Sequence, residues 1–246
     1  MPRALTTEFR KLGTIRSPWL LLALGPLIVV AGISGLVASG GNVHDPALQS
    51  RAFSHVGLAA IFTLMFGILA VAGEYSRGTI TDTFLSFPGR RSVIVAKLAA
   101  YGAVGAAAGL VSAGVALVVT AAWWSAKGGT FHLSAAGTWR TLGGGVAANV
   151  AFAAIGVGVG ALVRNVVAAV AAALAWIAVV EGIAGQLTGP GLARWLPFSA
   201  SEALDRASLT SSTGLLPQWG GGLVLLGYAA AFAAAGLVTT LRRDVT

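Results

Sequence analysis

The stretch from Glu74 to Lys97, EYSRGTITDTFLSFPGRRSVIVAK, decides how the rest of the chain is arranged. It is a polar passage between two apolar runs, at about 55–73 and 98–124, and neither run contains Lys, Arg, Asp or Glu. Each run is long enough to cross the apolar core of a bilayer, so the passage between them lies at one membrane face. Four of its six charges are positive. Because inner loops are enriched in Lys and Arg, this passage is predicted to be cytoplasmic.

The composition is that of an integral membrane protein. Of the 246 residues, 56% are hydrophobic and only 10% are charged, against about 25% charged residues in soluble domains. The formal charge of +8 does not indicate a nucleic-acid partner, because the basic residues fall at the ends of spans rather than on one face. The chain has no cysteine, which excludes disulfides, a thiolate nucleophile and cysteine metal ligands.

The apolar runs predict an all-α membrane protein that forms a single transmembrane domain over residues 1–246. Six spans are expected, at about 18–38, 55–73, 98–124, 142–163, 166–186 and 220–240. With this assignment, eleven of the sixteen Lys and Arg residues lie on the segments predicted to be inside. The bias places both termini in the cytoplasm and predicts a multi-pass protein of the plasma (cytoplasmic) membrane.

Two segments outside the predicted spans have helical character. In residues 1–17, Leu5, Phe9 and Leu12 fall at helical spacing while Glu8, Arg10 and Lys11 lie off that stripe, which fits an N-terminal interfacial helix. A plain basic flank to the first span fits almost as well. Residues 187–218 are expected either to dip into the outer leaflet as a re-entrant segment, with Ser199 or Ser201 as an N-cap, or to form a structured outer loop. Residues 39–54 are expected to be an outer loop.

Small residues recur four apart in two of the spans. Gly105 and Gly109 share one face of the third span, and Gly156 and Gly160 share one face of the fourth. Such spacing lets helix backbones approach closely in lipid, so these glycines are predicted to lie in helix-packing interfaces. A flexible hinge is the alternative.

The sequence contains few residues that could carry chemistry. It has no P-loop, HExxH or GxSxG pattern, and its three histidines lie far apart, so we expect no catalytic residues and no metal site. Glu181 is the one acid inside a predicted span. Acids in membranes are costly and often functional. Three roles remain open for Glu181: a solvated or hydrogen-bonded structural residue, a part of a translocation path, or a proton-coupling group.

The polar passage also carries a family resemblance. Its order of Glu74, Gly78-Thr79, Phe84-Leu85, Pro88, Arg90-Arg91 and Lys97 resembles the inner loop of ABC-2 type transporter permeases. The six spans with both termini inside and the long outer segment before the last span agree with that family. The resemblance extends over essentially the whole chain.

The resemblance implies that the passage contains a cytoplasmic coupling helix between the second and third spans, which docks on a separate ATP-binding subunit. A helix from about Thr79 to Phe87 would present apolar contacts inside a basic rim, as protein interfaces require. An interfacial loop with its aromatic residues among lipid headgroups is the alternative. The implied contact residues are Glu74, Arg77, Thr79, Phe84, Leu85, Phe87, Arg90 and Arg91.

By this resemblance the chain is the permease subunit of an ATP-driven exporter of a drug, peptide or lipid-like substrate. A second permease copy or a paralogue would complete a dimeric pore, and the partner ATPase would bind ATP and Mg²⁺, with no cofactor on this chain. The alternatives are an ion-coupled secondary transporter that uses Glu181, a non-transporting immunity or assembly protein, and a membrane-bound enzyme. A membrane-bound enzyme would need polar residues clustered at one membrane depth, and the sequence shows no such cluster.

Overall fold

The computed structural model describes residues 2–14, 17–87, 89–133, 136–187, 189–205 and 214–242, and within these ranges the regular structure is all helical. Two elements are not α-helices: η1 is a 3-10 turn and η2 is a π-helical turn. In chain order the elements are α1 (Pro2–Thr14), α2 (Ser17–Ala38), α3 (Pro46–Ser54), η1 (His55–Ala59), α4 (Ala60–Ser76), α5 (Ile80–Ser86), α6 (Arg90–Ala126), α7 (Ala136–Val163), α8 (Val166–Ala175), η2 (Trp176–Glu181), α9 (Gly182–Leu187), α10 (Pro190–Ala193), α11 (Pro197–Asp205) and α12 (Gln218–Arg242).

Five helices in the described ranges are long and apolar enough to cross a membrane. They are Trp19–Ala38, Ala47–Ser76, Arg90–Ala126, Gly137–Val163 and Gln218–Leu241. The stretch predicted as the fifth span, 166–186, is a shorter apolar helix over Val166–Glu181 that continues into α9. The protein is therefore a multi-pass membrane protein with five clear candidate spans, and a sixth crossing remains a prediction.

The helical part of the second span begins earlier than expected. The outer loop predicted over 39–54 was wrong for its second half, because α3 starts at Pro46 and runs through η1 into α4. Asp45 accepts a hydrogen bond from the Ala47 amide (2.8 Å), and Pro46 occupies the first helical position. An Asp N-cap followed by Pro is a helix-start signal, although the same two residue types are also common in turns.

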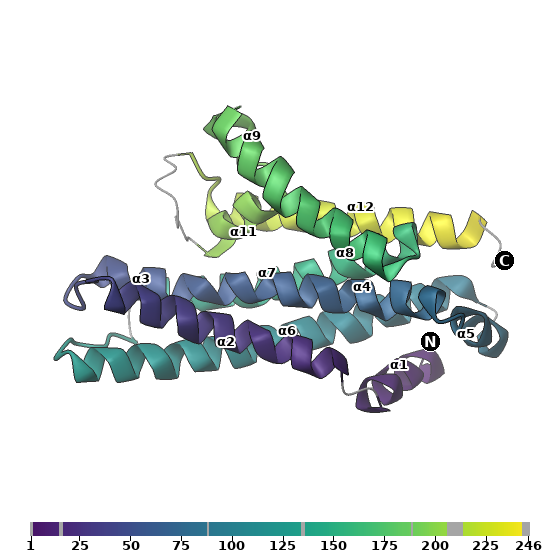
Figure 1. Cartoon of the computed structure of the whole chain (residues 1–246), viewed down its shortest axis with the longest axis horizontal. Helices are drawn as coiled ribbons and strands as arrows, with labels where there is room; N and C mark the ends of the chain where they lie inside the picture. The colour runs from purple at the N-terminus through teal and green to yellow at the C-terminus, as the bar shows by residue number, and fades with distance from the viewer. Residues whose placement is uncertain are drawn as a thin grey trace.

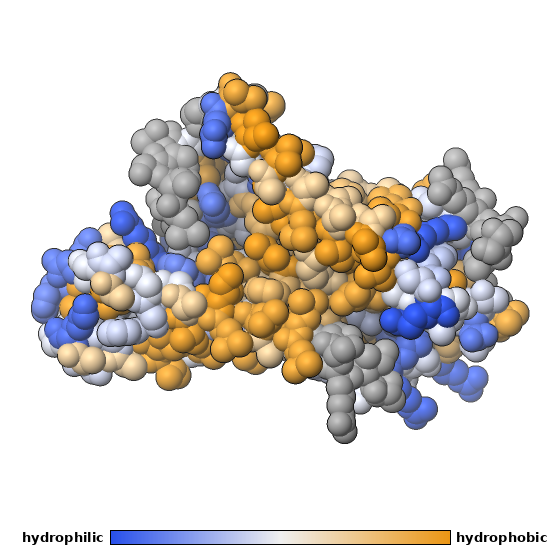
Figure 2. Space-filling view, viewed as in Figure 1, coloured by the Kyte–Doolittle hydropathy of each residue, from blue (hydrophilic) through white to orange (hydrophobic). Residues whose placement is uncertain are grey.

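The bundle is organised around α7, which packs against α4, α6 and α12 (Figure 1). The α8–α9 arm tilts away from the bundle, above α12. The N-terminal helix α1, the short helix α5 and the end of α12 all lie at one end of the molecule, called here the α5 end; α3 and α11 lie toward the opposite end. Figure 2 shows an apolar belt between two polar ends, as expected of a protein surrounded by lipid.

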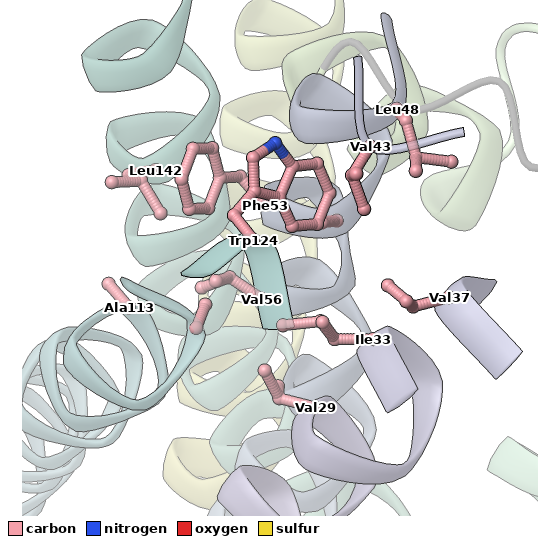
Figure 3. Close-up of a cluster of buried hydrophobic side chains, with 12 residues drawn as sticks. Val29, Ile33, Val37, Val43, Leu48, Phe53, Val56, Ala113, Trp124 and Leu142 are labelled. Carbon is pink, nitrogen blue, oxygen red and sulfur yellow. The ribbon is translucent and has the colours of Figure 1, made fainter. Parts of the chain in front are cut away.

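Buried side chains fill the space between the helices along the whole bundle. Toward the end opposite α5, Phe53 of α3 and Trp124 of α6 pack with Val29 and Ile33 of α2 (Figure 3). All four are essentially inaccessible to solvent. This core holds α2, α3 and α6 together at the α3 end. The polar side chains at the α5 end are held by hydrogen bonds and ion pairs.

Helices α4 and α7 pack closely together, and glycine permits this contact. A Cβ at Gly156 would collide with the backbone oxygen of Leu64, and one at Gly160 would lie 2.7 Å from the backbone oxygen of Ile68. Where α6 meets α7, a Cβ at Gly105 of α6 would lie 2.7 Å from the Asn149 oxygen, and one at Gly109 would lie 2.9 Å from the Val146 Cα. The four glycines thus lie where α7 packs against α4 and α6.

Replacing Gly156 with alanine should destabilise the protein, because backbone atoms of α4 would have to move away. Overpacking of this kind costs about 1–3 kcal/mol. The matched control is Gly114→Ala in α6, where a Cβ would meet nothing within 4 Å. We expect Gly156→Ala to lower the apparent Tm of the detergent-purified chain while Gly114→Ala leaves it unchanged or raises it. Equal Tm values for the two variants would contradict the close α4–α7 contact.

Candidate functional site

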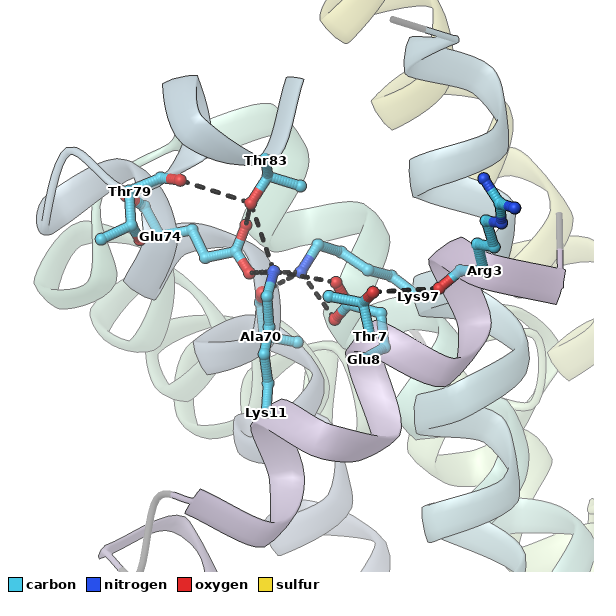
Figure 4. Close-up of polar contacts among 9 residues, drawn as sticks. All are labelled: Arg3, Thr7, Glu8, Lys11, Ala70, Glu74, Thr79, Thr83 and Lys97. Carbon is cyan, nitrogen blue, oxygen red and sulfur yellow. Dashed lines mark hydrogen bonds and ion pairs between the residues drawn. The ribbon is translucent and has the colours of Figure 1, made fainter. Parts of the chain in front are cut away.

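Four charged side chains meet beneath α5 and form what we call the charge cluster: Lys11 and Glu8 of α1, Glu74 of α4, and Lys97 of α6 (Figure 4). They comprise two positive and two negative groups, so the cluster is electrically neutral if all four are ionised. Glu8, Glu74 and Lys97 are buried. Burying charges is costly unless they are paired and hydrogen-bonded, and the geometry here meets both conditions.

Lys97 lies at the centre of the charge cluster and is 0% exposed. Its Nζ donates to Glu74 Oε1 at 2.7 Å, to Glu8 Oε2 at 2.9 Å and to the backbone oxygen of Ala70 at 3.0 Å. A lysine ammonium has three N–H donors, so each has an acceptor. Lys97 therefore joins α6 to both α1 and α4.

Lys11 extends the charge cluster to α5. Its Nζ donates to Glu74 Oε1 at 2.7 Å, to Glu8 Oε1 at 3.0 Å and to the Thr83 hydroxyl of α5 at 3.2 Å. Burial by itself would lower the pKa of Lys11, but hydrogen bonds and charges from Glu74 and Glu8 outweigh burial and raise the pKa. The stability that this ion pair contributes is present at neutral pH and is lost only as the pH rises through the raised pKa.

The amphipathic helix α1 turns a different face to the protein than its apolar spacing suggested. Its buried residues are Ala4, Glu8 and Leu12, one turn apart, whereas Phe9 is 47% exposed. The spacing of the apolar residues predicts that Glu8 lies on the polar side of the helix, and the structure corrects this prediction. The physical reason is Lys97, whose buried ammonium needs a second carboxylate.

The short helix α5 corresponds closely to the helix predicted over 79–87. It follows Gly78, whose positive φ of 71° reverses the chain after α4. Thr83 and Ile80 face inward, while Leu85 is 76% exposed. Arg77 and Thr79 are exposed before the helix and Phe87 follows it, half-buried. Pro88 of the sequence motif lies outside the described residues.

A polar pocket of about 360 Å³ opens between α1 and α5. Thr7 and Lys11 line it from α1, and Arg77, Asp82 and Phe87 line it from α5 and its flanks. The base of the pocket includes Glu74. Glu74 is predicted to contact a partner. Its carboxylate accepts hydrogen bonds from Lys11, Lys97 and Thr83 of this chain.

Two arginines connect this end of the bundle to α12. Arg90 Nη1 donates to the Thr240 backbone oxygen at 3.1 Å, and its guanidinium lies 5.4 Å from the centre of the Phe84 ring in α5. Arg164, in the turn between α7 and α8, donates to the Thr239 oxygen at 3.0 Å. Cations satisfy the free carbonyls at helix C-termini. Arg91, the neighbour of Arg90, is exposed.

Glu181 lies far along the chain from the charge cluster and binds the N-terminus of α11. Its carboxylate accepts from the Phe198 amide at 2.9 and 3.0 Å and from the Ser199 amide at 3.3 Å. Free amides at a helix N-terminus favour an anion. Of the three roles open for Glu181, this geometry fits the hydrogen-bonded structural one, and a carboxylate from another helix takes the position expected for a Ser199 or Ser201 cap.

Sequence reasoning missed two features of the structure. The first is the pairing of Glu74 and Lys97 with α1, although the acid ending one span and the lysine opening the next are a usable signal. The second is Asp205 at the end of α11, which is 3% exposed and lies against Gly57 and Gly144. Its Oδ1 has no hydrogen-bond partner among the described residues.

Within the part of the chain that the structure describes, no three or more His, Cys, Asp or Glu side chains come together as potential metal ligands.

Removing Lys97 should destabilise the protein strongly, because Glu8 and Glu74 would then share only Lys11. Losing one partner of a buried ion pair costs about 3–5 kcal/mol. We therefore expect Lys97→Met to lower the apparent Tm well below that of Arg91→Met, which removes an exposed cation from the same helix. Similar Tm values for both variants would show that the charge cluster does not hold α1, α4 and α6 together.

Comparison with known proteins agrees with this arrangement. A family model described as "ABC-2 family transporter protein" matches residues 6–245, which include most of α1 and every later helix to α12. No curated relative matches the sequence. The match includes the charge cluster, α5 and the apolar helices. The chain belongs to the ABC-2 transporter family, and it is a multi-pass membrane protein with the role of an ABC permease.

Proposed function

We propose that this protein is the permease subunit of an ATP-driven exporter, in which α5 docks on a separate ATP-binding subunit at the cytoplasmic face of the plasma membrane. ATP and Mg²⁺ would bind to that partner, and this chain would supply the translocation path with a second copy or a paralogue. Drug-like, peptide or lipid-like compounds are the proposed cargo. The family membership supports an ABC partner in general terms.

The observation that carries the proposal is that α5 is tied to the membrane helices at two points. Through Thr83 it binds Lys11 and Glu74 of the charge cluster, which connects it to α1, α4 and α6. Through Phe84 it packs against Arg90, which holds the end of α12. A force applied to α5 by a moving partner would therefore reach four other helices through short, direct contacts.

The outward side of α5 has the character of a docking surface. Leu85 presents an apolar side chain at a polar end of the molecule, with Asp82 and Ser86 exposed beside it. An apolar anchor surrounded by polar residues is typical of protein interfaces. We propose Arg77, Thr79, Phe84, Leu85, Phe87, Arg90 and Arg91 as the contact surface, with Glu74 supporting it from beneath.

Replacing Leu85 with aspartate should weaken association with the ATP-binding subunit. The side chain is 76% exposed, so the change should leave folding and membrane insertion intact. Loss of an apolar anchor at an interface costs about 2 kcal/mol or more, which corresponds to a loss of affinity of about thirtyfold or more. The measurement is recovery of a Walker-motif ATPase with the tagged chain from native membranes in mild detergent.

The matched control is Leu192→Asp, which makes the same change at another exposed leucine, in α10. We expect the control to retain the ATPase and Leu85→Asp to lose most of it at equal membrane expression. Equal ATPase recovery with both variants would argue against α5 as the docking element.

A further inference from the structure

We propose that the half-open apolar cavity lined by α4, α7, α8–η2, α11 and α12 binds a hydrophobic organic cation, with Glu181 as its counter-charge. The cavity has a volume of about 330 Å³, within the range of small-molecule sites. It lies where the α8–α9 arm diverges from the bundle (Figure 1). Neither the docking of α5 nor the charge cluster involves this region.

The walls of the cavity are unusually rich in aromatic side chains. Five of its fourteen lining residues are aromatic and come from four elements: Phe152, Trp176, Phe198, Tyr228 and Phe232. Phe152 and Phe198 are in contact, with ring centres 4.5 Å apart and planes inclined by 50°. Aromatic faces attract organic cations, and the attraction strengthens where water is excluded.

The π-helical turn η2 places a carboxylate next to this aromatic wall. Trp176 and Glu181 are the first and last residues of η2, and the Trp176 indole donates a hydrogen bond to the Glu181 carboxylate. Because Trp176 lines the cavity, this contact places the carboxylate beside the aromatic wall. The Glu181 carboxylate also binds the amide of Phe198, another lining residue, and is close enough to Tyr228 to interact electrostatically.

The negative charge beside the cavity has no cationic partner within the ranges that the structure describes. All four ion pairs found there belong to the charge cluster. Glu181 is held by the backbone amides of α11 and by the neutral side chain of Trp176, and the carboxyl of Glu202 acts on it as a second acid. The amides stabilise the carboxylate without cancelling its charge, so a cation is the complementary ligand.

The lining also decides what kind of cation would fit. An inorganic ion would lose its hydration shell among side chains that offer almost no oxygen ligands, which is costly. A cation with a large apolar body would bury that body against the aromatic rings and keep its charge near Glu181. As a statement about the exported substrate, this inference rests on the proposed function; binding itself does not require the ATP-binding subunit.

The test is equilibrium binding of tetraphenylphosphonium to the full-length chain in phosphatidylcholine nanodiscs, with binding to empty nanodiscs subtracted. Triphenylphosphine oxide serves as the uncharged probe. The key variant is Glu181→Gln, which keeps an oxygen acceptor for the Phe198 amide and removes the charge. Asp82→Asn, which removes an exposed carboxylate at the α5 end, is the matched control.

We expect saturable tetraphenylphosphonium binding that weakens about tenfold in Glu181→Gln, the effect of one nearby charge in a partly solvated site, and is unchanged in Asp82→Asn. Binding of triphenylphosphine oxide should not depend on residue 181. Tyr228→Leu, which leaves the Glu181–α11 contact alone, should also weaken tetraphenylphosphonium binding.

Two results would overturn the inference. One is the absence of saturable tetraphenylphosphonium binding to the unaltered chain. The other is an equal response of the two probes to Glu181→Gln, which would indicate a groove for lipid acyl chains. Either result would leave the ATPase-recovery experiment on Leu85 unaffected, so failure of this inference is distinguishable from failure of the proposed function.

Discussion

A lysine ammonium buried inside a membrane protein must be matched by acceptors, and this requirement organises the α5 end of the bundle. Lys97 obtains its acceptors from two helices, through Glu8 of α1 and through Glu74 and Ala70 of α4. Each carboxylate in turn needs a further cation, which Lys11 supplies. Since an incomplete set would leave a buried charge unpaired, α1, α4 and α6 are stable only together. The apolar core at the opposite end contains no buried charges that need specific partners, so it does not specify in this way which helices must meet.

The same network explains how a seven-residue helix can matter to the whole fold. By itself α5 is too short to be stable. Thr83 holds it at the charge cluster, and Phe84 holds it at Arg90. Its position is therefore coupled to the positions of α1, α4, α6 and α12. Its remaining exposed face carries Leu85. A short helix that is anchored on one side and exposes one apolar residue among polar ones on the other is suited to pass movement between a soluble subunit and membrane helices.

The sequence was sufficient where local patterns decide the structure. Apolar runs located five of the six expected spans within the described ranges, and the resemblance of residues 74–97 to the inner loop of ABC-2 permeases placed α5 to within a residue at each end. It was misleading at Asp45-Pro46, where one dipeptide signals either a turn or a helix start. It was insufficient where distant residues meet, as for Glu8 and Lys97, 89 positions apart. The π turn at Trp176 was also hidden, because an almost uniformly apolar run has no periodicity to reveal it.

If α1 holds α5 in place through Lys11, removal of the Lys11 ammonium must loosen α5, and hydrogen exchange measures that loosening. Exchange of the amides in residues 80–86 would be followed by mass spectrometry for the unaltered chain and for Lys11→Met in nanodiscs. We predict faster exchange in both α5 and α1 of the variant, because Thr83 and Glu8 each lose a contact, with no change in α7. Unchanged exchange in α5 alongside faster exchange in α1 would contradict it, because α5 would then be held independently of the charge cluster.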